Sequence, residues 1–100
     1  MHRNTNPMNK QLLEAIYDKI PNGYYEEYYS TQFILDLFAT RGFILNNKDF
    51  TYNSLHNFLS WCKLRQIIYK KKDNGKLYLR INQEQLKYYL KRFKEDGKRT

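Results

Sequence analysis

The sequence predicts one small α+β domain, mainly helical, with a single β-hairpin. Apolar residues recur at helical spacing in four separate segments. The pair Asn74-Gly75 separates two runs of strand-forming residues, which is the strongest short-range signal for a hairpin. One hundred residues, 41% of them hydrophobic, suit one domain with a modest core. No repeat or linker divides the chain, so we expect a single domain over 1–100, ordered from about residue 7 to 93.

The first helix is expected to begin at Asn6-Pro7, because Asn caps a helix well and Pro suits the first helical position. Its apolar positions are Leu12, Leu13, Ile16 and Ile20. Pro21-Asn22-Gly23 ends it. Residues 24–29, a run of tyrosine and glutamate, are short and rich in strand formers, so they predict an edge strand.

Two further helices are predicted in the middle of the chain. Ser30 or Thr31 caps the second, and Gly42 is placed to end it in a left-handed conformation. The apolar stripe of this helix is Phe33, Ile34, Leu37 and Phe38. After a connection over residues 43–50, Thr51 caps a third helix that runs to about Lys63. Its buried face is Leu55, Phe58, Leu59 and Cys62.

The predicted hairpin pairs Ile67-Ile68-Tyr69 with Leu77-Tyr78-Leu79 around the Asn-Gly turn. Asn82 and Gln85 have the spacing of a capping box, which predicts a final helix. The apolar stripe of that helix is Leu86, Tyr89, Leu90 and Phe93. Residues 94–100 form a charged tail that we expect to fray.

Charge is unevenly distributed along the chain. The net charge is +8, yet residues 1–50 hold five basic and six acidic residues and sum to −1. The second half, with thirteen basic and four acidic residues, therefore carries +9. A charge block on one half of a small domain favours a polyanionic partner. A basic surface that serves only solubility is the alternative.

The segment from Thr51 to Asn82 resembles the winged helix superfamily. Thr51-Tyr52-Asn53-Ser54-Leu55-His56-Asn57-Phe58-Leu59 is similar to a recognition helix, and the runs 67–69 and 76–82 are similar to the strands of the basic wing that follows it. The resemblance covers about residues 9–93 in architecture and implies a winged helix-turn-helix, in the order helix, strand, helix, helix, hairpin, helix. Residues 42–51 separate the two central helices by more than the compact bacterial form does. Either the second helix ends later than expected, or the turn carries an insertion.

The third helix has a polar face opposite its apolar stripe. With Leu55 at the centre of the buried side, Asn53, Asn57 and Ser60 point away from the core. Tyr52 and His56 flank them. Asn can pair with an adenine edge through two hydrogen bonds, and Ser and His can contact bases or phosphates. An exposed Asn in an Asn-rich chain needs no such role, so the hypothesis concerns the face as a whole.

Cations are concentrated on the hairpin and just before it. They are Lys70, Lys71, Lys72, Lys76 and Arg80 on the hairpin, with Lys63 and Arg65 at the end of the third helix. Like charges this close repel one another. Phosphate contacts would remove the repulsion and release counterions. Lysines also protect an exposed strand edge against aggregation, and both roles are compatible.

Two groups of tyrosines suggest other contacts. Tyr24, Tyr25, Tyr28 and Tyr29 have rings of the kind that stack on unpaired bases. Glu26 and Glu27 lie among them and would repel a phosphate backbone, so we expect this run to cover the core or to contact a protein. Tyr88-Tyr89 lies among cations of the last helix and suits a dimer contact or contact with a nucleic-acid backbone. Those cations are Lys87, Lys91 and Arg92.

The residue pattern does not favour catalysis or metal binding. The four glycines are not clustered, so no phosphate-binding loop is predicted, and Glu26 and Glu27 point to opposite sides of a strand. Asp36 and Asp49 have no histidine nearby in sequence. Cys62 is the only cysteine, which excludes an internal disulfide and predicts a small core residue. With His2 and His56 it falls short of the roughly four ligands of a structural zinc site.

These observations predict a non-enzymatic protein without a cofactor that binds duplex DNA. No apolar run approaches the roughly 20 residues that span a bilayer, and the N-terminus lacks a signal-peptide pattern, so we expect no membrane partner and a cytoplasmic protein, or a nuclear one in a eukaryote. The expected role is a small transcriptional regulator or replication accessory factor, of a mobile element or virus, as a monomer or homodimer. The alternative is a winged-helix interaction module or inhibitor that binds a nucleic-acid-handling protein through residues 24–29 or the last helix. RNA is a third option.

Overall fold

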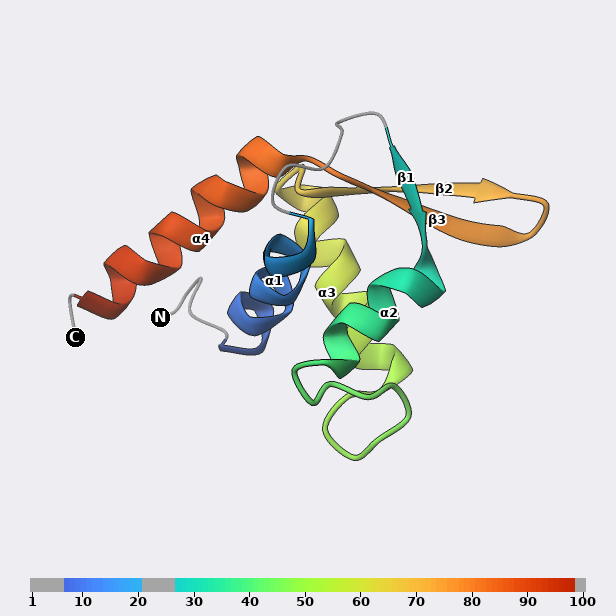
Figure 1. Cartoon of the computed structure of the whole chain (residues 1–100), viewed down its shortest axis with the longest axis horizontal. Helices are drawn as coiled ribbons and strands as arrows, with labels where there is room; N and C mark the ends of the chain where they lie inside the picture. The colour runs from blue at the N-terminus through green and yellow to red at the C-terminus, as the bar shows by residue number, and fades with distance from the viewer. Residues whose placement is uncertain (1–6, 21–26, 99–100) are drawn as a thin grey trace.

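Four helices and a three-stranded antiparallel sheet make up the part of the chain that the structure, a computed structural model, describes: residues 7–20 and 27–98, with side chains to residue 95. The helices are α1 (Pro7–Lys19), α2 (Thr31–Ala39), α3 (Tyr52–Leu64) and α4 (Gln83–Lys98). The strands are β1 (Tyr28–Ser30), β2 (Ile68–Asp73) and β3 (Lys76–Ile81). The predicted order of elements is the order found in these residues (Figure 1).

The sheet is built around β3, which pairs with both other strands in the order β1-β3-β2. Asp73 stands opposite Lys76, so the hairpin turn consists of the two residues between them. Asn74 and Gly75 have φ angles of 52° and 77°, and positive values at both positions define the tight turn that the Asn-Gly pair predicts. The predicted edge strand is confirmed for Tyr28 and Tyr29, while residues 24–26 lie outside the described part of the chain.

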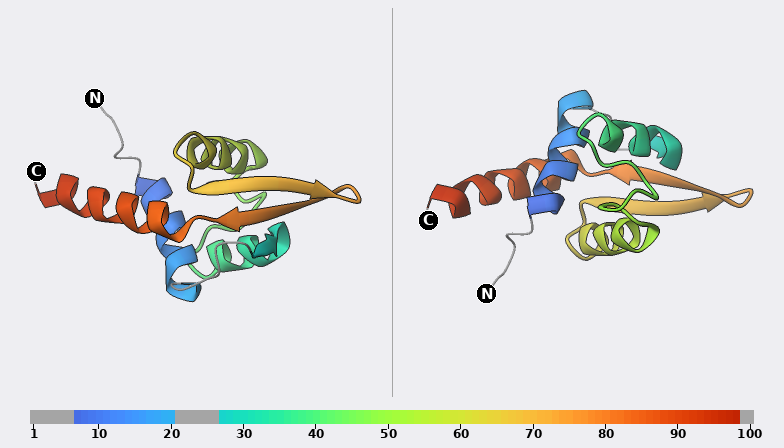
Figure 2. Two further views of the ribbon diagram at one scale, coloured as in Figure 1. Left: turned by 90° about the horizontal axis from the view of Figure 1, so that it is seen from above. Right: turned by 90° about the horizontal axis from the view of Figure 1, so that it is seen from below.

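Helices α1, α2 and α3 lie on one side of the sheet (Figure 1). Viewed from the opposite side, no described helix crosses in front of the strands (Figure 2). Successive strand residues point to opposite faces, so Ile68, Leu79 and Ile81 are buried toward the helices. The hairpin extends past the helices at its turn end, where the helix-facing side chains Lys70 and Lys72 are exposed (Figure 1). Helix α4 leaves the other end of β3 and packs on α1.

Aromatic rings hold the middle of the core together. The ring of Phe38 on α2 meets the rings of Phe50 and Phe58 edge to face, with centroids 6.0 and 5.7 Å away. Trp61 on α3 contacts Tyr89 and Phe93 on α4 at centroid distances of 6.0 and 6.1 Å. Because neighbouring aromatic rings interact favourably beyond the area they bury, these contacts join α3 to α2 and to α4.

The ends of α2 and α3 follow the predicted capping residues. The hydroxyl oxygens of Ser30 and Thr51 accept hydrogen bonds from the backbone N–H groups of Phe33 and Ser54, both at 3.1 Å. After α2, Gly42 has φ 89° and its N–H donates to the carbonyl of Ala39, as predicted for a left-handed stop. The expected start and stop of α1, at Asn6 and at residues 21–23, lie outside the described residues.

A long connection over residues 40–51 joins α2 to α3. Helix α2 ends at Ala39, so the first of the two alternatives, a later helix end, is wrong. Residues 40–51 fold back on themselves: the N–H of Asn46, at φ 72°, donates to the carbonyl of Phe50 at 2.9 Å. Phe50 is 1% exposed and anchors this loop to the core.

Helix α4 differs from the expectation in two respects. Asn82 accepts a hydrogen bond from the Gln85 N–H at 3.3 Å, but the Gln85 side chain donates to the carbonyl of Arg65 at 2.7 Å instead of completing a capping box. The last carbonyls of α3 need partners, and the Gln85 amide meets one of them. The helix also continues to Lys98, beyond the expected end of the ordered part at about residue 93. Long unbranched Lys and Glu side chains lose little rotamer freedom in a helix.

Phe33 does not belong to the buried stripe of α2, contrary to the expectation. Its side chain is 42% exposed, whereas Ile34, Leu37 and Phe38 are buried. Phe33 lies in the first turn of the helix, next to β1, and its ring stacks on that of Tyr29 with the centroids 5.6 Å apart. The helical period alone does not show which apolar residues lie at the edge of the core and stay exposed.

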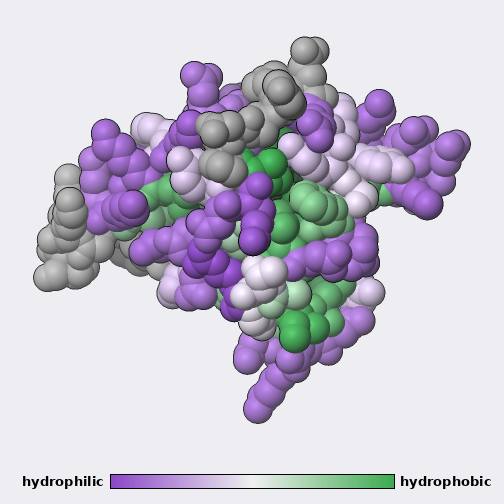
Figure 3. All heavy atoms as spheres, in the orientation of Figure 1, coloured by the Kyte–Doolittle hydropathy of each residue, from purple (hydrophilic) through white to green (hydrophobic). Residues whose placement is uncertain are grey.

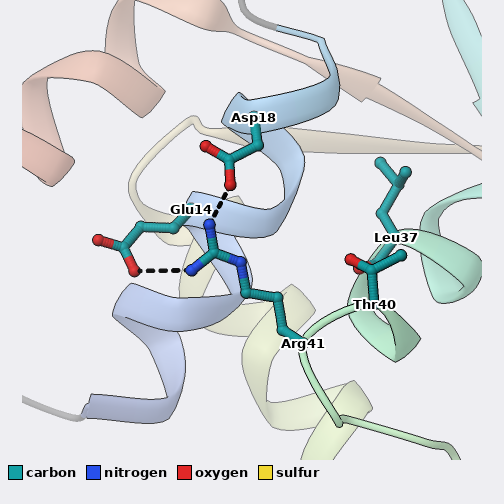
Figure 4. Close-up of polar contacts among 5 residues, drawn as sticks. All are labelled: Glu14, Asp18, Leu37, Thr40 and Arg41. Atoms are coloured by element: carbon teal, nitrogen blue, oxygen red, sulfur yellow. Dashed lines mark hydrogen bonds and ion pairs between the residues drawn. The ribbon is translucent and has the colours of Figure 1, made fainter.

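An ion-pair group joins the residue after α2 to α1 (Figure 4). The Arg41 guanidinium contacts the carboxylates of Glu14, at 3.4 Å, and Asp18. All three side chains are partly exposed, so we expect the pairs to contribute about 0–1 kcal/mol each. Their main effect is on local charge: the positive charge of Arg41 is offset by the two neighbouring carboxylates.

Cys62 is a core residue, as predicted, and is fully buried. Burial raises the pKa of its thiol well above the ordinary value, and the nearby Arg65 offsets only part of that rise. A buried, protonated thiol is a poor nucleophile.

We expect Phe38→Ala to lower the free energy of unfolding by about 3–5 kcal/mol, because it leaves a cavity between two other rings. The matched control is Phe33→Ala on the same helix, whose exposed ring should cost about 1 kcal/mol. Urea unfolding monitored by circular dichroism measures both variants. Equal losses would contradict this account of the core.

The Cys62 thiol predicts a specific pH dependence of stability. In the folded protein the thiol stays protonated, whereas in the unfolded chain it ionises above about pH 8.5. The free energy of unfolding should therefore fall as the pH rises through that value. Cys62→Ala should remove this part of the slope in urea titrations between about pH 7 and 9.5. Rapid reaction of the unsubstituted protein with a thiol reagent under native conditions would show that the Cys62 thiol is accessible and contradict this prediction.

Candidate nucleic-acid interface

The polar face of α3 is open, as predicted. Asn53, His56 and Asn57 are exposed, and Tyr52 is 63% exposed at the start of the helix. Ser60, one turn further on, is half-buried, so the accessible part of this face is its N-terminal half. The helix contains no acidic residue between Tyr52 and Leu64. The face therefore offers amide, imidazole and phenol groups without a carboxylate that would repel phosphates.

The hairpin lies directly beside this helix. Helix α3 packs against β2, the strand at the edge of the sheet on that side (Figure 2). The end of the hairpin projects from the body of the molecule and is covered by hydrophilic side chains (Figure 3). Its four lysines are all exposed: Lys70, Lys71, Lys72 and Lys76.

The strand register divides these lysines between two faces. Lys70 stands opposite Leu79 and Lys72 opposite Leu77, so these two point to the side on which the helices lie. Lys71 stands opposite Tyr78 and points to the other side, as does Lys76 opposite Asp73. The prediction treated the lysines as one cluster; the structure gives each face of the hairpin two of them.

Two arginines of the predicted cluster are engaged within the protein. The Arg65 guanidinium lies over the Trp61 ring, 4.4 Å from its centroid, and also donates to the Trp61 carbonyl at 3.2 Å. The Arg80 guanidinium lies 4.8 Å from the centroid of Tyr69 and 5.8 Å from that of Tyr28. Both arginines are half-buried. They contribute positive potential to the surface, but the exposed lysines and Lys63 are the more accessible cations.

Tyr69 and Tyr78 are surface residues that sequence reasoning did not single out. Both lie on the hairpin face that points away from the helices, together with Tyr28 of β1. The signal was present in the sequence: once Asn74-Gly75 fixes the register, alternation places Tyr69, Tyr78 and Arg80 on one face.

The tyrosine run before α2 splits between the two faces of the sheet. Tyr28 points outward, whereas Tyr29 is half-buried and packs against the core, as expected for core cover. Burial raises the pKa of the Tyr29 hydroxyl, and the neighbouring Glu27 carboxylate adds to the rise. Tyr24 and Tyr25 lie outside the described residues.

A second group of cations lies on α4. Lys87 and Lys91 line a groove between α1 and α4, whose opposite wall carries the Glu14, Asp18 and Arg41 ion-pair group. Arg92 donates to the hydroxyl of Tyr88 at 3.0 Å, and the Tyr88 side chain is 49% exposed. Acidic residues face these cations, so the groove is less strongly basic than the hairpin.

Metal-binding groups are not assembled in the described part of the chain. Residues 7–20 and 27–98 contain no cluster of three or more His, Cys, Asp or Glu side chains suited to hold an ion. Among the same residues, no helix is both long and apolar enough to cross a membrane.

Comparison with known proteins gives this chain no family: it matches no protein-family model and no curated protein sequence.

Proposed function

We propose that the protein is a winged helix-turn-helix domain that binds duplex DNA without catalysing a reaction. The observation that carries the proposal is the proximity of two surfaces: the exposed, carboxylate-free face of α3 and the projecting hairpin with its four exposed lysines. A helix beside a basic hairpin combines a group that can enter a groove with groups that can hold phosphates.

The topology supports this proposal. A helix, a short edge strand, two helices, a hairpin and an antiparallel sheet in the order β1-β3-β2 are the arrangement typical of winged helix domains. The long connection over residues 40–51 departs from the compact bacterial form. It adjoins the N-terminal end of α3, so it would lie close to DNA that contacts Asn53 (Figure 1).

In the proposed complex, α3 lies in the major groove. Asn53 and Asn57 are one helical turn apart on the exposed face, so both amides can reach base edges from one docking position. The exposed hairpin lysines and Lys63 contact phosphates on either side. The proposed roles are those of a small transcriptional regulator or a replication accessory factor.

A second candidate function is binding to a protein that handles nucleic acid. It is favoured by the edge strand β1, beside which the exposed ring of Phe33, 42% exposed, stacks on the half-buried ring of Tyr29. An edge strand with an apolar patch suits pairing with a strand of a partner. The salt dependence of DNA binding separates the two candidates.

We expect the affinity for duplex DNA to fall steeply with salt. With about four to seven phosphates contacted, the logarithm of the binding constant should fall against the logarithm of salt concentration with a slope of roughly −4 to −6. Fluorescence anisotropy with a labelled duplex measures it. An affinity that does not change between about 50 and 200 mM salt would contradict the proposal and favour the protein partner.

Substitutions should separate phosphate contacts from base contacts. Replacing Lys70, Lys71, Lys72 and Lys76 together by Gln should weaken binding to every duplex alike and flatten the salt slope. Asn53→Ala or Asn57→Ala should cost about 1–3 kcal/mol on a preferred site, found by selection from a random library, and far less on random duplex.

The control for this pair of experiments is Gln11→Ala, which removes an exposed amide from α1, away from both surfaces. Thermal melting should be nearly unchanged in all variants, because none of these residues belongs to the core. Unchanged affinity of the Asn variants on the preferred site would show that α3 does not read bases. Unchanged affinity of both sets would place the DNA elsewhere on the protein.

A further inference from the structure

The face of the sheet that points away from the helices carries aromatic rings and cations in alternating positions. We call it the outer face and define it by six residues: Tyr28, Tyr69, Lys71, Lys76, Tyr78 and Arg80. None of the described helices lies over it (Figure 2). The core on the opposite side is complete without it, since Ile68, Leu79 and Ile81 are at most 1% exposed.

The outer face is ordered in rows across the strands. In one row Tyr28, Arg80 and Tyr69 stand side by side, because Arg80 is the register partner of both tyrosines. The guanidinium carbon lies 4.8 Å from the centroid of the Tyr69 ring and 5.8 Å from that of Tyr28. The next row has Tyr78 opposite Lys71, whose Nζ reaches back to 5.1 Å from the Tyr28 centroid.

The charge of this face is strongly biased. Lys71, Lys76 and Arg80 are positive. Among the residues of the described strands, the alternation of side chains places one carboxylate on this face, that of Asp73, opposite Lys76. Tyr28 is 38% exposed, and Tyr69 and Tyr78 are half-buried, so part of each side chain is accessible. Cation–π contacts alone can stabilise a sheet, but such a role does not require the rings to be gathered on a face that no described helix covers.

We propose that the outer face binds single-stranded nucleic acid. Unpaired bases would stack on the rings of Tyr28 and Tyr69 and on the guanidinium plane of Arg80 between them, while Lys71 and Lys76 contact the phosphates. Aromatic rings interleaved with cations suit unpaired bases, whose faces are free to stack, whereas the base faces of a duplex are covered by their neighbours. This site is separate from α3 and does not depend on duplex binding, although Lys71 and Lys76 belong to both proposed surfaces.

The test is a set of anisotropy titrations with three labelled strands of about ten nucleotides, within the usual footprint of single-strand binders. They are oligothymidylate, oligouridylate and an abasic strand of the same length. The first two distinguish DNA from RNA, and either can occupy the proposed site. We expect at least one of them to bind clearly more tightly than the abasic strand, which carries the phosphates without the bases.

Substitutions locate the site. Tyr28→Leu and Tyr69→Leu remove a ring but keep an apolar side chain, and each should weaken single-strand binding about 5- to 150-fold. Tyr69→Phe, which keeps the ring, should bind like the parent. The matched control is Phe33→Leu, which removes an exposed ring from α2. Circular dichroism and thermal melting verify the fold of each variant.

The same variants are titrated with duplex DNA, so that this proposal and the duplex proposal fail separately. Loss of single-strand binding with duplex binding retained supports the outer face, and Asn53→Ala should show the reverse. Four results would overturn the proposal: equal affinity for the abasic strand, parent-like binding by both Tyr→Leu variants, an equal loss in Phe33→Leu, or no binding to any single strand.

Discussion

The register of β3 determines most of what this molecule presents to its surroundings. The two-residue turn at Asn74-Gly75 sets Asp73 opposite Lys76, and from there each pair along the hairpin is fixed. A shift of β3 by one residue would exchange its two faces: Tyr78 and Arg80 would turn toward the helices, and Leu79 and Ile81 would turn to the solvent. Burial of Leu79 and Ile81 opposes that shift, because their transfer to water is unfavourable.

Where the helices stop determines which hairpin residues are accessible. Near its start, β2 is covered on its inner face by α3, and Ile68 is fully buried. Farther along, the inner-face positions Lys70 and Lys72 extend past the core and are exposed. Lysines at these positions keep the projecting part of the strand hydrated and hinder its pairing with a strand edge of another molecule. The positive end of the molecule is thus a consequence of a hairpin that is longer than the core beneath it.

Polar contacts connect elements that are far apart in sequence. The Gln85 side chain of α4 donates to the Arg65 carbonyl at the end of α3, and that of Gln83 donates to the Ile20 carbonyl after α1. Each meets a carbonyl near a helix end that lacks a partner within its own helix. These bonds and the Trp61 contacts hold α4 against α1 and α3, so the helix bearing the proposed reading face has a fixed position relative to the hairpin.

Much of this fold was determined by short-range signals in the sequence. Ser30, Thr51 and Gly42 mark helix ends through bonds and φ angles within a few residues, and Asn74-Gly75 requires only its own backbone conformation. The polar face of α3 follows from the helical period alone. The tertiary structure decided what depends on distant partners: the exposure of Phe33, the engagement of Arg65 and Arg80 with aromatic rings, and the use of Gln85 to join α4 to α3. It also brought Tyr28 beside Arg80, because only pairing of β1 with β3 places residues so far apart in sequence on one face.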